Sequence, residues 1–261
     1  MTAGTPQATT LFRFHGSAGD FLPPEKRHRS FHHHFRGTPS VKDRIETLGT
    51  PHTEVAFICI DGNFCGFERR LHGGESVEVH GADSPVRARA PRLNDPPGGE
   101  PRFVADVNLG RLARLLRLLG FDTLYRNDYC DPEVAGISSN EQRILLTRDR
   151  RLLMRREVQH GYFVRADRPS RQAPEVIRRF ELQTEARPFG RCSRCNGLVH
   201  GVAKDDVLTL LEPRTRRYYD AFWQCSECGQ VYWEGSHMTG LQQLMAQIAR
   251  SGELDVPKND S

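Results

Sequence analysis

The chain has 261 residues, with 37 Lys and Arg residues against 33 Asp and Glu residues and a formal net charge of +4. Apolar residues make up 37% of it, and no apolar run reaches the roughly 20 residues of a membrane-spanning helix. The first ten residues lack the basic and apolar pattern of a signal peptide, so we expect a cytoplasmic protein without membrane contact.

The seven cysteines are expected to be metal ligands or free thiols rather than disulfides in such a compartment. The basic residues comprise 33 Arg and only four Lys. Arginine is suited to phosphate contacts, but a GC-rich genome produces the same bias, so both interpretations stay open.

Residues 10–90 are predicted to form a small β-grasp domain. Apolar periodicity predicts strands at 10–14, 30–35, 55–60 and 76–80 and a helix at 41–48. His32, His33 and His34 are adjacent in one strand and must alternate between its two faces, so we expect an exposed polar strand there rather than a metal site.

Residues 91–100 are predicted to be a linker because the surrounding stretch, 85–101, contains five prolines. It includes Gly98-Gly99, a pair that resembles the end of sulfur-carrier β-grasp proteins. Such a diglycine is activated only at a chain terminus, so the linker interpretation is preferred.

Residues 101–186 alternate between strands and helices, which is typical of the α/β class with a parallel sheet flanked by helices. Strands are predicted at 102–105, 121–125, 143–147 and 162–165, and helices at 107–119, 131–142, 151–157 and 174–182. In the first helix, leucines share one face, and Arg111, Arg114 and Arg117 share the other. The arginine face is therefore expected to meet solvent or a polyanion.

Three aspartates follow this pattern closely. Asp106 and Asp149 end two strands, and Asp131 caps the helix between them. Because the carboxyl ends of parallel strands lie at one edge of a sheet, the three side chains are expected to converge. Such carboxylates suit magnesium or manganese, which can activate water for attack on a phosphodiester. The alternative is that Asp131 only caps a helix and Asp149 only begins a turn.

Residues 187–240 contain a predicted zinc ribbon. Cys192 and Cys195 form one C-x-x-C pair, Cys225 and Cys228 form another, and 29 residues separate the pairs. Four thiolates with this spacing indicate a closed, structural zinc site. The intervening arginines and aromatic residues suit either base stacking on RNA or a ribbon hairpin that packs its aromatic residues inward. Lys204 and Arg214 are expected to flank a hairpin. Residues 241–261 are predicted to form a C-terminal helix and tail.

The chain from Arg102 to about His237 resembles the Mut-seven C-terminal RNase family, in which a PIN-like nuclease domain is fused to a zinc ribbon. The residues that carry the resemblance are 103–122, 143–149, 192–196, 225–228 and 231–237. Residues 10–90 are similar to the ubiquitin-like, ThiS-type β-grasp domain found ahead of this nuclease. His237 is the last residue of the resemblance, and a role for it in positioning substrate is a further hypothesis.

The resemblance implies a metal-dependent ribonuclease, with Asp106, Asp131 and Asp149 as catalytic ligands of magnesium or manganese and zinc as a structural cofactor. RNA is the expected partner. Four arginines are the candidate RNA contacts, namely Arg111, Arg114, Arg117 and Arg148. The β-grasp domain is a candidate site for a protein partner. The alternative function is a non-catalytic RNA- or protein-binding module built on the zinc ribbon.

Overall fold

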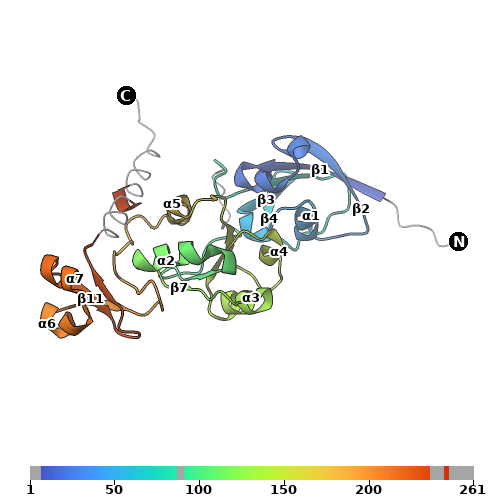
Figure 1. The fold of residues 1–261 in the computed structure, drawn as a ribbon. Coiled ribbons are helices and arrows are strands. Elements are labelled where there is room, and N and C mark those ends of the chain that lie inside the picture. The colour runs from blue at the N-terminus through green and yellow to red at the C-terminus, as the bar shows by residue number, and fades with distance from the viewer. Residues whose placement is uncertain (1–6, 87–90, 236–243, 247–261) are drawn as a thin grey trace, which may run out of the picture. The chain divides into compact units, whose positions relative to one another are not determined.

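The computed structural model describes residues 7–86, 91–235 and 244–246 (Figure 1). By packing, the chain divides into two compact units, residues 1–97 with 131–163 and residues 98–130 with 164–261. Among the described residues, no helix has both the length and the apolar character needed to cross a membrane. His237 and most of the predicted C-terminal helix and tail lie outside the described residues, and the domain boundaries stay predictions.

The first unit begins with a five-stranded mixed sheet, which confirms the predicted β-grasp domain. Its strands are β1 (Gln7–His15), β2 (Ser30–Arg36), β3 (Phe57–Ile60), β4 (Asn63–Cys65) and β5 (Ser76–His80). Their order is β2-β1-β5-β3-β4, with β1 and β5 parallel and the other neighbours antiparallel. The strand β4 was not predicted, because it has only three residues, which follow directly after the turn at Asp61 and Gly62.

One face of this sheet forms the core of the domain. Phe12 and Phe14 of β1 are fully buried and pack with Val41 and Ile45 of helix α1 (Val41–Thr47). The alternation predicted for the histidine strand is also observed. His32 and His34 are exposed, whereas the ring of His33 lies edge-on to Phe12 on the core side, with 5.8 Å between the ring centroids.

The first unit also contains a later part of the chain that packs on the β-grasp domain. This part comprises α3 (Asp131–Asn140), β8 (Ile144–Thr147), α4 (Arg150–Leu153) and β9 (Gly161–Phe163). The rings of Phe21 and Phe163 meet edge to face, with 5.4 Å between their centroids. Arg150 donates a hydrogen bond of 3.2 Å to the carbonyl oxygen of Phe21.

Two polar side chains of a short 3₁₀ turn, His52–Glu54, complete this packing. His52 Nε2 donates to the carbonyl oxygen of Val158 at 2.8 Å, and Glu54 Oε1 accepts from the backbone N–H of Phe163 at 2.6 Å. Both side chains are buried, with exposed fractions of 7% and 4%. Burial of these two polar side chains is tolerated because each has a hydrogen-bond partner.

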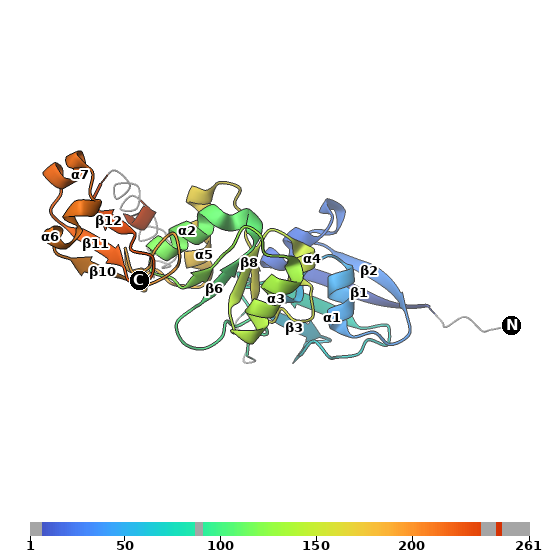
Figure 2. The same cartoon turned by 60° about the horizontal axis from the view of Figure 1, so that its bottom comes forward.

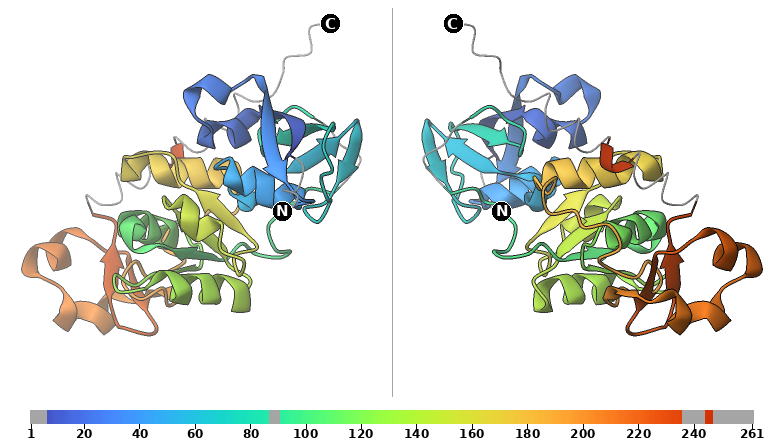
Figure 3. Two further views of the ribbon diagram at one scale, coloured as in Figure 1. Left: turned by 90° about the vertical axis from the view of Figure 1, so that its right-hand side faces the viewer. Right: turned by 90° about the vertical axis from the view of Figure 1, so that its left-hand side faces the viewer.

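The second unit supplies β6 (Phe103–Ala105), β7 (Thr123–Leu124), α2 (Gly110–Leu118) and α5 (Pro169–Arg179). β6 and β7 are parallel, as are β8 and β9, in a four-stranded sheet of order β7-β6-β8-β9. The predicted parallel sheet with helices is therefore confirmed. Figure 3 shows α2 in green and α5 in gold side by side. The predicted start of α5 at Pro174 was wrong, because Pro169 begins the helix five residues earlier.

The C-terminal part of the second unit is a three-stranded antiparallel sheet of β10 (Val199–Val202), β11 (Phe222–Cys225) and β12 (Val231–Trp233). The expected hairpin between Lys204 and Arg214 is absent from this described segment. Helices α6 (Lys204–Val207) and α7 (Pro213–Tyr218) stand between β10 and β11 instead (Figure 2). The insertion buries Val207 and Leu211 against the sheet, and Pro213 begins α7.

Candidate functional site

Asp106 is placed at the end of a fully buried strand. It follows β6 directly, is 5% exposed, and its Oδ1 atom accepts a hydrogen bond of 2.6 Å from the backbone N–H of Val107. This bond caps the 3₁₀ turn Val107–Leu109 that leads into α2. Strand, carboxylate and turn thus fix the Asp106 side chain where the sequence predicted it.

A cavity of about 320 Å³ opens in the second unit beside this turn, and we call it the α2 cavity. Its lining includes Asn108, Arg111, Arg114, Tyr125 and Asp167. The hydroxyl of Tyr125 donates to the carbonyl oxygen of Val107 at 3.1 Å. The cavity therefore brings two arginines, a carboxylate and an amide close to the turn that follows Asp106.

Gly110 at the start of α2 allows the Tyr125 contact. A Cβ atom at this position would lie 2.5 Å from the Tyr125 oxygen, well inside contact distance. Sequence reasoning found neither Tyr125 nor Asn108, because a single tyrosine and a single asparagine carry no spacing signal. The glycine at the first position of a helix was the one clue that another group comes close there.

The other two predicted acidic residues belong to the first unit. Asp131 is the exposed first residue of α3, and Asp149 is the exposed N-cap of α4. Asp149 Oδ1 accepts from the backbone N–H of Arg151 at 2.7 Å, and its own N–H donates to Thr147 Oγ1 at 2.9 Å. Because Asp106 belongs to the second unit, the meeting of the three carboxylates at one metal stays a prediction.

Asp128, in the loop after β7, pairs with a neighbouring arginine. Arg126 donates to both of its oxygens at 2.9 Å, and these hydrogen bonds lower the pKa of Asp128. Asp167 instead lines the α2 cavity. Of these two acids, Asp167 is therefore the better placed for a role at the site.

The four candidate RNA-binding arginines differ in exposure. Arg111, Arg114 and Arg148 are exposed, but Arg117 is only 4% exposed, so its expected place on a solvent-facing surface was wrong. Its guanidinium donates to four backbone carbonyl oxygens, which belong to Thr123, Tyr125, Ser193 and Arg194, at 2.7–3.5 Å. Burial lowers the pKa of Arg117. Helical spacing could not reveal that a separate segment covers this part of α2.

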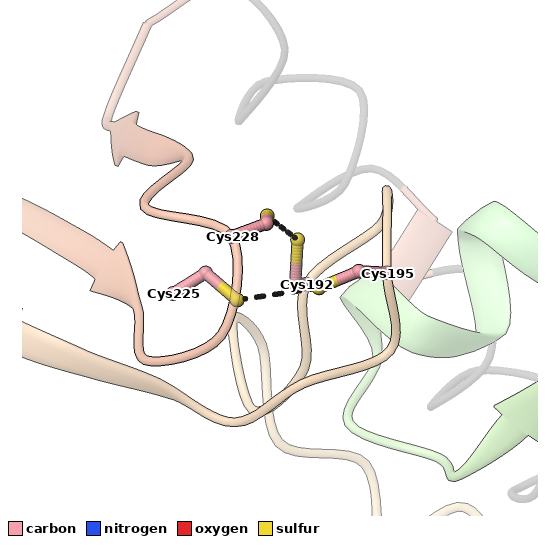
Figure 4. A group of neighbouring side chains, drawn as sticks. All are labelled: Cys192, Cys195, Cys225 and Cys228. Atoms are coloured by element: carbon pink, nitrogen blue, oxygen red, sulfur yellow. Dashed lines mark hydrogen bonds between the residues drawn. The ribbon is translucent and has the colours of Figure 1, made fainter.

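The structure brings the four predicted zinc ligands together. The sulfur atoms of Cys192 and Cys228 lie 3.6 Å apart, and those of Cys195 and Cys225 lie 3.4 Å apart (Figure 4). One ligand atom from each cysteine lies within 4.8 Å of the others. Zn–S bonds of 2.3 Å in a tetrahedron place sulfur atoms about 3.8 Å apart. The cluster thus has the composition and dimensions of a structural zinc site.

Burial and hydrogen bonding give Cys192, Cys195 and Cys228 different pKa values. Burial raises the pKa of Cys192, but hydrogen bonds from Tyr232 and from backbone groups outweigh it and lower the pKa to about 6. Burial raises the pKa of Cys195 to about 12 and also raises that of Cys228. Cys192 is therefore the thiol best prepared to bind metal as a thiolate.

Close packing around the cluster requires small residues. A Cβ atom on Gly197 would lie 2.4 Å from Glu227 Cγ and 3.1 Å from Cys225 Sγ. Asn196 and Gly229, one residue after the second cysteine of each pair, adopt φ values of 72° and 71°. These positions explain the Asn-Gly and Gly that follow the two C-x-x-C pairs.

The cysteine-bearing loop is also tied to β7. Asn196 accepts a hydrogen bond of 3.0 Å from the backbone N–H of Thr123 and donates one of 2.8 Å to Asp122 Oδ1. Together with the Arg117 bonds, these contacts join the zinc ribbon to the α/β part of the second unit. The ribbon is therefore a fixed part of this unit.

A larger cavity of about 1050 Å³, which we call the aromatic groove, lies on the ribbon side of α2. Its lining includes five aromatic and two basic residues, namely Phe189, Tyr218, Tyr219, Tyr232, Trp233, Arg114 and Arg214. Phe189 stacks on Trp223 with 5.1 Å between ring centroids. Arg114 lines both this groove and the α2 cavity, so the two cavities adjoin one side chain.

Comparison with models of protein families shows which family the chain belongs to. The model described as "Mut7-C RNAse domain" matches residues 101–245, and the model described as "Mut7-C ubiquitin" matches residues 7–87. The chain belongs to the Mut7-C RNase family. Comparison with curated proteins and with solved structures gave no significant match.

The Mut7-C RNase match covers Asp106, Asp131 and Asp149, the four cysteines, and the linings of both cavities. The Mut7-C ubiquitin match covers the five-stranded sheet. Both matches confirm the family resemblance read from the sequence. Membership in Mut7-C implies nuclease activity and an RNA substrate.

Proposed function

We propose that the chain is a metal-dependent ribonuclease that hydrolyses RNA phosphodiester bonds at a site formed by Asp106, Asp131 and Asp149. The observation that carries the proposal is the position of Asp106, held at the end of β6 beside a basic cavity inside the Mut7-C RNase match. Asp149 follows β8, another strand of the four-stranded sheet, and Asp131 begins the helix before β8.

The donor set of this site suits magnesium or manganese. Carboxylate oxygens are the ligands that hard divalent cations prefer, and the three proposed ligands are all aspartates. Such an ion, when bound, lowers the pKa of a water molecule and neutralises charge on the phosphate. Thr147 and the N-terminus of α4 orient Asp149, and the Val107 N–H orients Asp106.

The RNA strand would pass the α2 cavity and continue into the aromatic groove. Arg111 and Arg114 are exposed and suited to backbone phosphates, whereas the aromatic side chains offer platforms for stacked bases. Arg148 follows β8 and is a further phosphate contact in this proposal. Zinc at the four cysteines would hold the ribbon side of the groove without taking part in the chemistry.

Cleavage assays on single-stranded RNA with manganese test this proposal. The Asp106→Asn and Asp149→Asn proteins should bind RNA but lose cleavage, because the amide cannot replace a charged metal ligand. Asp128→Asn is the matched control, since Asp128 pairs with Arg126. Undiminished cleavage by both site variants would refute the assignment.

The aromatic groove also supports the second candidate function, a non-catalytic RNA-binding module. That alternative predicts tight RNA binding with no cleavage in the unmodified protein, whichever divalent ion is supplied. Elemental analysis would then find zinc but no manganese retained by the carboxylates.

A further inference from the structure

Three side chains with metal-binding atoms meet on the outer face of the β-grasp sheet. His15 ends β1, and His80 ends the adjacent parallel strand β5 directly beside it. Glu78 precedes His80 by two residues, so it projects from the same face. Sheet register, rather than sequence proximity, brings the three residues together.

The ligand atoms of these residues converge. His15 Nε2 lies 3.9 Å from Glu78 Oε1, and His80 Nε2 lies 3.7 Å from Glu78 Oε2. One ligand atom from each residue lies within 4.8 Å of the other two. Both measured distances exceed the usual hydrogen-bond length and lie in the range of ion-pair contacts.

The hydrogen bonding of the two rings leaves Nε2 atoms for a ligand. His80 Nδ1 lies 3.0 Å from Ser84 Oγ, a contact that fixes the ring. When Nδ1–H donates to this hydroxyl, the lone pair on Nε2 is available to a metal ion. Within the described part of the chain, His15 Nε2 is buried and has no hydrogen-bond partner. A buried polar atom of this kind requires an explanation, and an ion is one that fits.

We infer that His15, Glu78 and His80 bind a divalent transition-metal ion of the zinc type. Two imidazoles and one carboxylate are a ligand set that zinc uses with a fourth position open to water or substrate, and they are too rich in nitrogen for magnesium. Tetrahedral zinc with Zn–N bonds of about 2.05 Å places ligand atoms about 3.3 Å apart. The carboxylate must therefore move closer to both rings, because the present contacts of 3.9 and 3.7 Å involve different oxygens of Glu78.

Binding requires at least one ring to turn. The imidazoles of His15 and His80 stack with 4.5 Å between centroids and 7° between planes, so their in-plane nitrogen lone pairs do not yet meet. Rotation of the partly exposed His15 ring out of this stack brings both Nε2 atoms toward one ion. His80 is 3% exposed and held by its neighbours, so His15 and Glu78 make most of the movement.

A bound ion would join the C-terminal ends of β1 and β5. A hydrogen bond already links the chain just after these two strands, because the N–H of Ser17 donates to Asp83 Oδ1 at 2.7 Å. The ion would reinforce this connection between the two central strands. The site belongs to the Mut7-C ubiquitin match and is separate from the cysteine cluster in both sequence and ligand chemistry.

Zinc content measured by elemental analysis tests the inference. The full-length protein is saturated with zinc and passed through a desalting column, as are the Glu78→Gln and His15→Ala variants. The unmodified protein should retain one zinc ion more per chain than either variant. His32→Ala is the matched control, because His32 is exposed on the neighbouring strand, and it should retain the full amount.

Nitrogen NMR of the imidazole rings provides a second readout. Zinc should shift the Nε2 resonances of His15 and His80 in the unmodified protein and leave them unchanged in Glu78→Gln. Glu78 is partly exposed, so this nearly isosteric variant retains the fold even if a change at buried His80 does not. Equal zinc content in all proteins, or unshifted His15 and His80 rings, would overturn the inference.

Discussion

The guanidinium of Arg117 in α2 donates a hydrogen bond to the carbonyl oxygen of Arg194, which lies 3.2 Å away in the loop between Cys192 and Cys195. The same side chain also reaches Thr123 in β7 at 2.7 Å. One buried arginine therefore fastens the cysteine loop to two elements of the α/β part of the second unit.

Replacement of Arg117 by alanine should lower the free energy of unfolding of the second unit by roughly 2–4 kcal/mol, because several buried carbonyls lose their donor. Arg117→Lys should rescue little, since an ammonium group cannot reach carbonyls of separate segments at once. Urea unfolding measures the effect. Arg111→Ala serves as the exposed control on the same helix, and a loss there as large as in Arg117→Ala would contradict the structural role.

Removal of zinc should loosen the ribbon and the aromatic groove together. Tyr232 lines the groove and its hydroxyl lies 3.1 Å from Cys192 Sγ, so the cluster and the groove share a side chain. A strong chelator, or the Cys228→Ser change, should increase proteolysis within 192–235 and weaken RNA binding. Readdition of zinc should restore both in the unmodified protein, and RNA affinity that survives complete zinc loss would argue against this link.

Substitutions in the groove should separate stacking from charge. Trp233→Ala should weaken binding of single-stranded RNA by about 1–3 kcal/mol with little change in salt dependence, because it removes one stacking platform. Arg114→Ala should instead reduce the magnitude of the slope of log affinity against log salt concentration by about 1, since one phosphate contact is lost. Fluorescence anisotropy over a range of salt concentrations distinguishes the two. Identical salt slopes for all three proteins would exclude a phosphate contact by Arg114.

Glu75 should make the stability of the β-grasp domain depend on acid pH. Burial alone would raise the pKa of Glu75, but hydrogen bonds from the N–H groups of His72 and Gly73 and from Thr10 Oγ1 outweigh it, so the pKa is lowered. A lowered pKa stabilises the folded state above the unfolded value of 4.5. That contribution is lost as the pH falls below 4.5 and through the folded pKa.

The Glu75→Gln change should therefore cost about 1 kcal/mol at neutral pH and nearly nothing at strongly acid pH. Thermal unfolding of both proteins between neutral and acid pH measures the difference. Glu68→Gln, a change at an exposed residue of the same domain, is the control. A difference between Glu75→Gln and the unmodified protein that stays constant with pH would show that charge is not involved.

The parts of the structure that repeat regular spacing were predictable from the sequence. Alternation in β1, the leucine stripe of α2 and the two C-x-x-C pairs each follow local rules, and each agrees with the structure. The buried state of Arg117 was not predictable, because it depends on a loop 76 residues later in the chain. Periodicity defines which residues share a face but not what covers that face.

The same reasoning explains the other differences. The helices between β10 and β11 form because Val207 and Leu211 find a small core to cover, and short amphipathic segments of this length carry little periodic signal. The His15, Glu78 and His80 cluster depends on the register of two strands that are more than 60 residues apart. Asp106 was found because a carboxylate at the end of an apolar strand is a local pattern.

The contacts of His52 and Glu54 have a consequence for the order of folding. Their partners, Val158 and Phe163, follow 106 and 109 residues later, so the ribosome releases the β-grasp sequence long before these partners exist. Contacts between such distant residues carry a loop-closure cost and form slowly. The nascent β-grasp domain is therefore made before the partners of His52 and Glu54 are available, and its assembly with β9 becomes a late step in the maturation of the protein.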